Sequence, residues 1–291
     1  MRDNLNSCLS QGITPESFKA PPGAIPSIPK AGNLSGFATL FEIATMDLIL
    51  SDIHANLHAL RVVLRYARRR AIDRFVFLGD LVGYGAQPNQ VLDRIQPLKP
   101  KVLVRGNHDR ACAFENADDS FSLPARMAAT WTRDKLTREH LRFLQELPVG
   151  PLWVGEDYQI SHGSPLDEDA YLLHPQDALH AFDGFSAQVC FYGHTHLPGA
   201  YMLDEKAQIL AGIQLEPGEW FSIKEGCRYL INPGSVGQPR DRDPRLSFIS
   251  YDTKRKRLKL YRLEYDHVGA AKAILLAGLH PNLAERLQHG N

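Results

Sequence analysis

The stretch Gly193-His194-Thr195-His196 directly follows an apolar run at 189–192, so two histidines come immediately after a predicted strand. Four other polar clusters also follow short apolar runs that have the length of buried strands. These clusters are Asp52-Ile53-His54, Gly79-Asp80, Gly106-Asn107-His108-Asp109 and Ser161-His162-Gly163. Polar residues at the carboxyl ends of neighbouring strands face one crevice in open α/β sheets. The five clusters together therefore predict a single shared site.

Helices alternate with the first three of these strands. After the strand at 47–50, apolar residues at helical spacing predict an amphipathic helix whose N-cap is Asn56. Strands at 75–78 and 102–104 follow, with a short helix at 91–95 between them. Strands joined by crossover helices pair in parallel, so we expect a βαβαβ unit here.

The rest of the chain changes from helices to strands, and the fold class is α/β. Residues 111–147 are expected to be mostly helical, with Thr137 as a cap and Pro148 as a stop. Residues 165–185 are expected to form a small cap over the site, and a closing helix is expected at 268–276. Strands separated by glycine and proline loops, as in hairpins, are expected at 189–192, 199–204, 208–213, 228–231, 246–252 and 257–264.

Residues 1–45 differ in composition from the remainder of the chain. Prolines at positions 21, 22, 26 and 29 would interrupt any regular element, and Asn, Ser and Gly fill the gaps. We interpret this stretch as a disordered or loosely attached tail and residues 46–291 as a single domain. Met46 opens the first strand, and the sequence leaves open whether it is the true start of the protein.

Composition and charge narrow the class of protein. The 291 residues contain 33 Lys and Arg against 33 Asp and Glu, a balance that gives no electrostatic footprint for nucleic acid or for an anionic membrane. No apolar run is long enough to cross a membrane, and the first residues do not resemble a secretion signal. The four cysteines show no paired spacing, which is typical of a reducing compartment, so we expect a cytoplasmic protein.

The side chains in the five clusters are those that bind divalent cations. Carboxylates, imidazoles and an amide oxygen suit manganese, iron, zinc or magnesium. Asp52 and His54 are two residues apart at a strand end and so point the same way, which would let them bind one cation together. Asp80 has two oxygens and could bridge two cations, and a kink between His194 and His196 could send them to different ions. Two cations about 3.5–4 Å apart can clamp a phosphoryl group and activate a shared water, so the clusters predict a two-metal hydrolase of phosphate esters.

His108 follows a candidate ligand directly but need not be a ligand itself. A histidine beside such a centre could deliver a proton to a leaving alkoxide. Asp109 could orient this histidine or could cap the following helix, and the sequence does not distinguish the two roles. Histidines without a clustered partner, among them His140, are expected to face solvent.

The order of these motifs, D-x-H, G-D, G-N-H-D, H and G-H-T-H, closely resembles the calcineurin-like metallophosphoesterase superfamily. The motif spacing is similar to the bacterial phosphodiesterase branch of that superfamily, and so is the stretch Asn232-Pro233-Gly234-Ser235-Val236-Gly237-Gln238-Pro239-Arg240. The resemblance extends over residues 47–264 and implies a four-layer α/β/β/α sandwich of two packed sheets. The segment at 165–185 would add the small helical cap.

The resemblance also implies roles for individual residues. A metal-bridging hydroxide would attack phosphorus, and His108 would protonate the leaving group. Two sets of metal ligands are implied, with Asp80 in both. The first set is Asp52, His54, Asp80 and His196, and the second set is Asp80, Asn107, His162 and His194.

One motif departs from the protein serine/threonine phosphatases of the superfamily. Their G-D motif carries an arginine that grips phosphate, whereas this chain reads Gly79-Asp80-Leu81-Val82-Gly83-Tyr84-Gly85. Arg110 and Arg240 are candidate replacements, and Tyr84 could line the pocket. A monoester carries nearly two negative charges and a diester carries one, so the missing arginine favours phosphodiesters.

Two other functions stay open at this point. A phosphomonoesterase, including a protein or nucleotide phosphatase, would use the same ligands. A scaffold that has lost catalysis is disfavoured, because it would have no need to retain the ligands or His108. The expected partner is a small phosphate-ester substrate, and the sequence defines neither the oligomeric state nor which metals bind.

Overall fold

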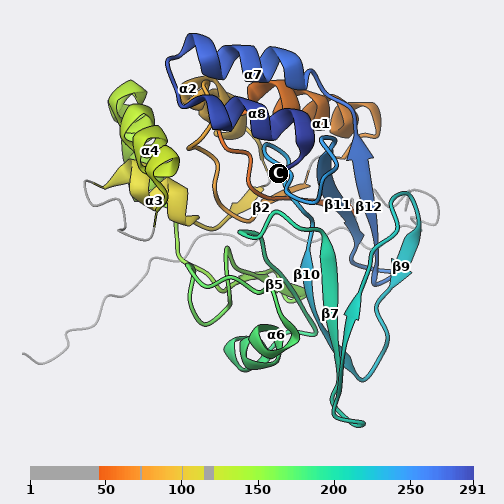
Figure 1. Ribbon diagram of the computed structural model, residues 1–291. Coiled ribbons are helices and arrows are strands. Elements are labelled where there is room, and N and C mark those ends of the chain that lie inside the picture. The colour runs from red at the N-terminus through yellow and green to blue at the C-terminus, as the bar shows by residue number, and fades with distance from the viewer. Residues whose placement is uncertain (1–45, 73, 100, 115–120) are drawn as a thin grey trace, which may run out of the picture. The chain divides into compact units, whose positions relative to one another are not determined.

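The computed structural model describes residues 46–72, 74–99, 101–114 and 121–291. The predicted tail at 1–45 lies outside the described residues. The first strand begins at Met46, as expected. The described elements form two six-stranded sheets with helices on their outer sides, which is the predicted α/β/β/α sandwich (Figure 1).

The first sheet contains the parallel unit expected from the sequence. Its strands, in spatial order, are β3 (Lys101–Leu103), β2 (Arg74–Phe77), β1 (Met46–Leu50), β11 (Leu246–Asp252), β12 (Arg257–Leu263) and β9 (Trp220–Ser222). The strands β1, β2 and β3 are parallel, and α1 (Leu57–Arg69) and α2 (Pro88–Ile95) are the crossovers between them. The Asn56 side chain accepts a hydrogen bond from the backbone N–H of Ala59, so it caps α1 as predicted.

The second sheet combines parallel and antiparallel pairs. Its strands, in spatial order, are β4 (Leu152–Val154), β5 (Tyr158–Ile160), β6 (Val189–Phe191), β10 (Cys227–Asn232), β7 (Gly199–Asp204) and β8 (Ile209–Ile213). The strand β6 is parallel to both of its neighbours, whereas β7 and β8 form one of the expected hairpins. The carboxyl ends of β5 and β6 therefore lie side by side.

Six further helices complete the described part of the chain. They are α3 (Asn107–Ala113), α4 (Leu123–Lys135), α5 (Arg138–Gln145), α6 (Pro175–Ala181), α7 (His267–Leu276) and α8 (Pro281–His289). Thr137 caps α5 by accepting a hydrogen bond from the backbone N–H of His140 at 3.1 Å. Among the residues that the structure describes, none of the helices has the length and apolarity that crossing a bilayer demands.

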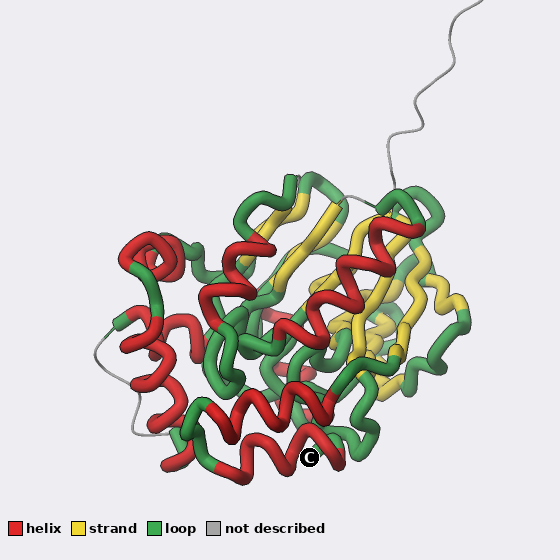
Figure 2. Tube along the Cα trace, turned by 90° about the horizontal axis from the view of Figure 1, so that it is seen from above, coloured by secondary structure: helices red, strands yellow, loops and turns green. Residues whose placement is uncertain are grey.

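Side-chain alternation along β1 separates the layers of the core. Leu48 and Leu50 belong to the cluster that packs the first sheet against α1, α2, α7 and α8. Ile49 belongs to the cluster between the two sheets. A third cluster joins α6 to the outer side of the second sheet, where Cys190 and Leu230 are buried. Seen from above, helices lie across the strands (Figure 2).

The predicted cap at 165–185 is only partly a cap. Helix α6 packs on the outer side of the second sheet, because Ala178 and Ala181 bury their side chains there. The part of the segment that reaches the site is the loop that contains Asp169 and Tyr171. The sequence interpretation missed β4, β9 and α8.

Candidate metal centre

The sequence-predicted ligands come from the ends of strands in both sheets. Asp52 and His54 lie in the loop after β1, and Asp80 lies in the loop after β2. Asn107 is the first residue of α3, which follows β3. The strands β5 and β6 of the second sheet lead into the remaining three ligand positions, His162, His194 and His196.

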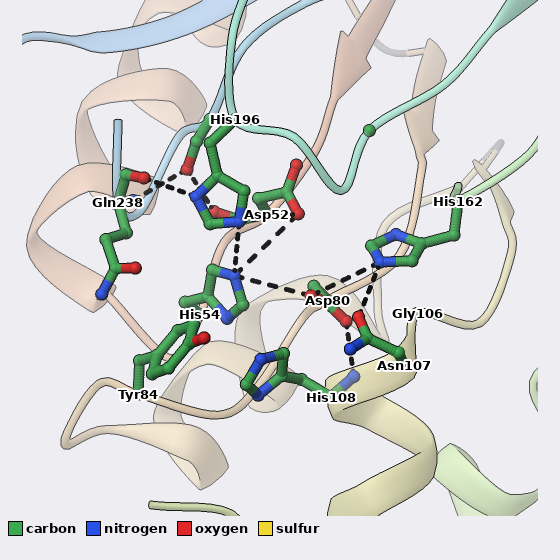
Figure 3. A network of polar contacts seen from close by, with 12 residues as sticks. Asp52, His54, Asp80, Tyr84, Gly106, Asn107, His108, His162, His196 and Gln238 are labelled. Atoms are coloured by element: carbon green, nitrogen blue, oxygen red, sulfur yellow. Dashed lines mark hydrogen bonds and ion pairs between the residues drawn. The ribbon is translucent and has the colours of Figure 1, made fainter. Parts of the chain in front are cut away.

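The structure brings these side chains together in two groups that share Asp80. Figure 3 labels all of them except His194. In each group, one possible ligand atom from every member lies within 4.8 Å of the others. The first group is Asp52, His54, Asp80 and His196, and the second is Asp80, His162 and His194. The Oδ1 atom of Asn107 lies 3.0 Å from Nε2 of His162 and so joins the second group. The grouping is the one that the resemblance implied.

The backbone at five of the seven ligand positions is left-handed rather than extended. The φ angles are 53° at Asp52, 48° at His54, 53° at Asp80, 66° at His194 and 61° at His196. Non-glycine residues rarely adopt positive φ, and such strain concentrates at functional sites. Asp52 and His54 were expected to point the same way because of strand alternation. The two side chains do converge, but their backbone is not extended, so strand alternation is not the cause. The kink expected between the last two histidines is present, and they belong to different groups.

Close backbone packing fixes the loop around Asp80. Gly79 has φ of +93°, a backbone conformation that glycine adopts without strain. A Cβ on Gly106 would lie 2.1 Å from Oδ1 of Asp80, so only glycine fits beside this carboxylate. Oδ1 accepts a hydrogen bond of 2.8 Å from the backbone N–H of His108. The carboxylate is thus held from one side, and its other oxygen faces the imidazoles.

Each of the four candidate histidine ligands has one ring nitrogen against a main-chain carbonyl. The distances are 3.2 Å from His54 Nδ1 to Val82 O, 2.7 Å from His162 Nδ1 to Leu78 O, 3.0 Å from His194 Nε2 to Asp169 O and 2.5 Å from His196 Nδ1 to Gln238 O. A carbonyl accepts but cannot donate, so this nitrogen carries the ring proton. When the ring is neutral, the opposite nitrogen presents a lone pair to the centre. This is the arrangement in which protein imidazoles bind metals.

The first group has buried acceptors and no matching donors among the described residues. Nε2 of His54 and Nε2 of His196 lie 3.2 Å apart, and both carry lone pairs when the opposite ring nitrogens are protonated. Both carboxylate oxygens of Asp52 are buried without a hydrogen-bond partner. Converging buried lone pairs are costly unless a cation lies among them. The side chains in this group therefore fit a divalent cation.

Burial and neighbouring carboxylates set the protonation state of each histidine in the metal-free centre. Burial holds the pKa of His54 and His196 well below the ordinary value and lowers the pKa of His194 to about 3. These rings are neutral at pH 7, which is the form that binds metals. Burial also lowers the pKa of His162, but the carboxylates of Asp80 and Asp52 outweigh burial and raise it to about 10. In the metal-free centre a proton therefore occupies the second group.

His108 lies beside the centre with its ring packed among aromatic side chains. Its ring centroid is 4.2 Å from that of Tyr84 and 4.6 Å from that of Phe121. Nδ1 is buried and has no hydrogen-bond partner in the described structure. Burial, with a contribution from the positive charge of Arg240, lowers the pKa of His108 to about 4. The ring is neutral at pH 7 in the absence of an added negative charge.

The Asp109 carboxylate accepts hydrogen bonds from backbone N–H groups and does not bind the His108 ring. Its Oδ1 accepts hydrogen bonds from the N–H groups of Leu81 at 2.8 Å and Val82 at 3.1 Å, and its Oδ2 accepts from Gly106 at 3.1 Å. Of the two roles left open by the sequence, the structure supports capping of the following helix. This carboxylate ties the start of α3 to the loop after Asp80.

A cavity of about 550 Å³ opens beside His108. Volumes of this size accommodate whole small-molecule ligands rather than a single phosphate group. Aromatic rings form much of its wall, and the Tyr171 ring stacks on His194 with centroids 3.9 Å apart. The aromatic and basic residues along the wall include Tyr84, Phe121, Tyr171, Arg240 and Arg286.

The two candidate phosphate-binding arginines differ in their surroundings. The Arg110 guanidinium lies 2.5 Å from Glu168 and 2.9 Å from Asp169, so two carboxylates hold it. Arg240 lines the cavity, and its Nη2 is 3.4 Å from the Tyr84 hydroxyl and 3.3 Å from Oε1 of Gln238. Sequence reasoning did not single out Phe121, Tyr171 or Arg286 for this wall, because none of them lies in a polar cluster.

Comparison with known proteins supports the class of protein that this centre defines. Residues 46–256 match the family model of the calcineurin-like phosphoesterase superfamily domain. The match covers more than half of the chain, so the chain belongs to this superfamily, as its motifs indicated. Family membership and the paired donor groups together define a metal-dependent phosphoesterase.

Individual relatives include both uncharacterized and named proteins. An uncharacterized protein from Methanocaldococcus jannaschii is 34% identical over 248 residues, which cover 84% of this chain and 98% of the relative. Phosphodiesterase YfcE from Escherichia coli is 25% identical over 206 residues, which cover 68% of this chain and 82% of that protein. The crystal structure of a metallophosphoesterase from Sphaerobacter thermophilus has a TM-score of 0.74 and 37% identity, and the alignment covers 84% of this chain and 99% of that one.

Proposed function

We propose that this chain hydrolyses phosphodiesters at a centre of two divalent cations. The observation that carries the proposal is the pair of buried donor groups that share Asp80. A single cation would leave the donors of one group without a partner. The related phosphodiesterase YfcE supports the choice of reaction.

Seven side chains would hold the cations, which we expect to be manganese, iron, zinc or magnesium. The first cation would bind Asp52, His54, Asp80 and His196, and the second would bind Asp80, Asn107, His162 and His194. When bound, such cations supply Lewis-acid polarisation of the phosphoryl oxygens and lower the pKa of a water molecule. The carbonyl contacts of the imidazoles keep the ligand nitrogens pointed at the centre.

His108 is our candidate for the proton donor. In the reaction, the water oxygen bonds to phosphorus, the bond from phosphorus to the leaving oxygen breaks, and the leaving alkoxide takes a proton from His108. The attacking water loses one proton to solvent, and His108 takes up one proton from solvent before the next turnover, so protons and charge balance. The neutral ring of the free protein gains its proton when the negative substrate phosphate enters, because that charge raises the pKa of His108.

Two features of the cavity favour diesters. The aromatic side chains of Tyr84 and Phe121 offer a surface for a second ester substituent. Arg110 is occupied by Glu168 and Asp169, so it does not supply a bidentate grip on a dianion. Arg240 is the observation in favour of the second candidate, a phosphomonoesterase, because its guanidinium lines the cavity beside Tyr84.

The test compares two chromogenic esters on protein of defined metal content. The protein is stripped with a chelator and reloaded with one metal at a time, and kcat/KM is measured for bis-p-nitrophenyl phosphate and p-nitrophenyl phosphate. We expect no turnover without metal and a higher value for the diester. A clear excess for the monoester would replace the diesterase proposal with the phosphomonoesterase, and full activity of metal-free protein would refute both.

We also propose that the protein works in the cytoplasm on a small phosphate ester. The three cysteines in the described part of the chain, Cys112, Cys190 and Cys227, are buried free thiols. Free thiols are typical of a reducing compartment.

A further inference from the structure

Two guanidinium groups line the cavity without a carboxylate partner among the described residues. Arg240 contacts only neutral oxygens there, and its Nε is buried without a hydrogen-bond partner. Arg286 is half-buried and makes no described side-chain hydrogen bond or ion pair. The one acidic side chain on the cavity wall, Asp169, is already bound to Arg110. Asn291, the last residue of the sequence, also lines the cavity and adds a carboxylate, but the two guanidinium groups outweigh it, so this part of the cavity is positively charged.

Helix α8 places Arg286 on the cavity wall with little freedom. The same helix buries Leu283, Ala284 and Leu287, which lie beside Arg286 around the helix axis, in the core cluster of the first sheet. Helices α7 and α8 pack together above that sheet (Figure 1). Helix α8 also lies beyond residue 256, where the match to the family model ends. The packing of the helix therefore sets where the backbone of Arg286 lies on the cavity wall.

The cavity extends well beyond the metal centre. Its lining includes Asn107, His108 and His194 from the metal centre and also Ser122, Ala125 and Arg286, which come from the start of α4 and from α8. A volume of about 550 Å³ leaves space for a substituent after the reacting phosphate has occupied the donor groups. An arginine guanidinium can bind phosphate through two parallel N–H groups, and an arginine that has no carboxylate partner keeps those groups available.

We infer that Arg286, together with Arg240, forms a subsite for a second phosphate group carried by the substrate. The inference rests on the proposed phosphodiesterase function and narrows its substrate class. The substrate would be a phosphodiester in which one esterified alcohol bears a further phosphate monoester. The reacting phosphate lies at the metal centre, and the second phosphate reaches the wall formed by α8.

A matched pair of chromogenic diesters tests this subsite. One is the p-nitrophenyl ester of thymidine 5′-phosphate, and the other is the same molecule with an added 3′-phosphate. Both release p-nitrophenolate from the same diester bond. We expect the 3′-phosphate to raise kcat/KM by about tenfold or more, the range of a charge-assisted contact. Equal values for the two diesters would overturn the inference.

Three variants test whether Arg286 causes the preference for the 3′-phosphorylated substrate. Arg286→Gln should remove the advantage of the 3′-phosphate, and Arg286→Lys should keep part of it because the charge remains. Arg61→Gln, which changes an exposed arginine on α1, is the control and should leave the ratio of the two substrates unchanged. An advantage that survives in Arg286→Gln would also overturn the assignment.

A binding measurement separates failure of the subsite from failure of the proposed function. If neither diester is hydrolysed, the diesterase proposal fails, but calorimetry can still compare thymidine 3′,5′-bisphosphate with thymidine 5′-phosphate. The subsite predicts about tenfold tighter binding of the bisphosphate, and Arg286→Gln should lose that difference. Equal affinities for the two nucleotides would refute the subsite independently of turnover.

Discussion

Replacing His108 with alanine should slow the hydrolysis of alkyl phosphodiesters far more than that of nitrophenyl diesters. A nitrophenolate leaves without a proton, whereas an alkoxide needs one in the transition state. A positioned proton donor contributes about 10²–10⁴-fold to the rate, so we expect a loss of that size with a methyl or sugar leaving group. The loss with p-nitrophenolate as the leaving group should stay below about tenfold.

The surroundings of His108 determine the free energy needed to protonate its ring at pH 7. With a pKa of about 4, only about one ring in a thousand is protonated at pH 7 in the free protein. Protonation at pH 7 therefore costs about 4 kcal/mol, since each pKa unit corresponds to about 1.36 kcal/mol. This cost belongs to the metal-free centre, where burial and Arg240 lower the pKa of His108, and the negative charge of a bound phosphate acts in the opposite direction.

The assay follows the ratio of kcat/KM for the alkyl ester to kcat/KM for the nitrophenyl ester as the pH changes. Metal binding affects both substrates alike, so it cancels in the ratio. The protonated fraction of His108 falls as the pH rises above about 4, so the ratio should fall with rising pH in the natural protein and stay level in His108→Ala. His180→Ala, which removes an exposed histidine on α6, is the control. Equal losses on both esters, or a level ratio in the natural protein, would show that His108 does not donate the proton.

Three further predictions concern the metal centre and the N-terminal 45 residues. Asp80→Asn should lower bound metal from two ions to one or none and cut turnover by about a thousandfold or more. The control, Asp134→Asn on the exposed face of α4, should change neither quantity. Elemental analysis measures the bound metal, and kcat measures the turnover. In metal-free protein the raised pKa of His162, about 10, means that its stabilising pair with Asp80 is intact below pH 6.5 and is lost as the pH rises to about 10. Metal affinity should increase over the same window, and calorimetry in buffers of different ionisation enthalpy should detect the released proton. A chain that begins at Met46 should keep its Tm and its turnover, and a large loss of either would mean that residues 1–45 contribute to the fold.

Local sequence signals predicted the elements that hold the site. The N-caps Asn56 and Thr137 accept hydrogen bonds within their own helices, so neighbouring residues are sufficient to recognise them. The apolar runs that became β1, β5 and β6 have side chains buried on both faces, whereas β3 is only partly buried. Signals of this kind do not depend on the rest of the fold.

The features that sequence reasoning missed depend on distant partners. His140 was expected to face solvent, but it is buried at 5% exposure because Asn89 and Asp93 of α2 bind its two ring nitrogens. The left-handed backbone at the ligand positions has no local marker such as glycine. Arg286 reaches the cavity only because α8 packs on the first sheet, and no motif connects it to the metal centre.

The span of the contacts around the centre determines when a newly made chain can bind metal. A nascent chain that ends just after His196 already contains all seven candidate ligands. It still lacks Gln238, whose carbonyl orients His196, and Ser235, whose hydroxyl bonds to the Asp52 carbonyl across 183 residues of sequence. It also lacks β11, the neighbour of β1 in the first sheet. Contacts of such long sequence separation form late in folding. A chain that is still incomplete at this point therefore carries every candidate ligand but lacks the contacts that hold Asp52 and His196 in place.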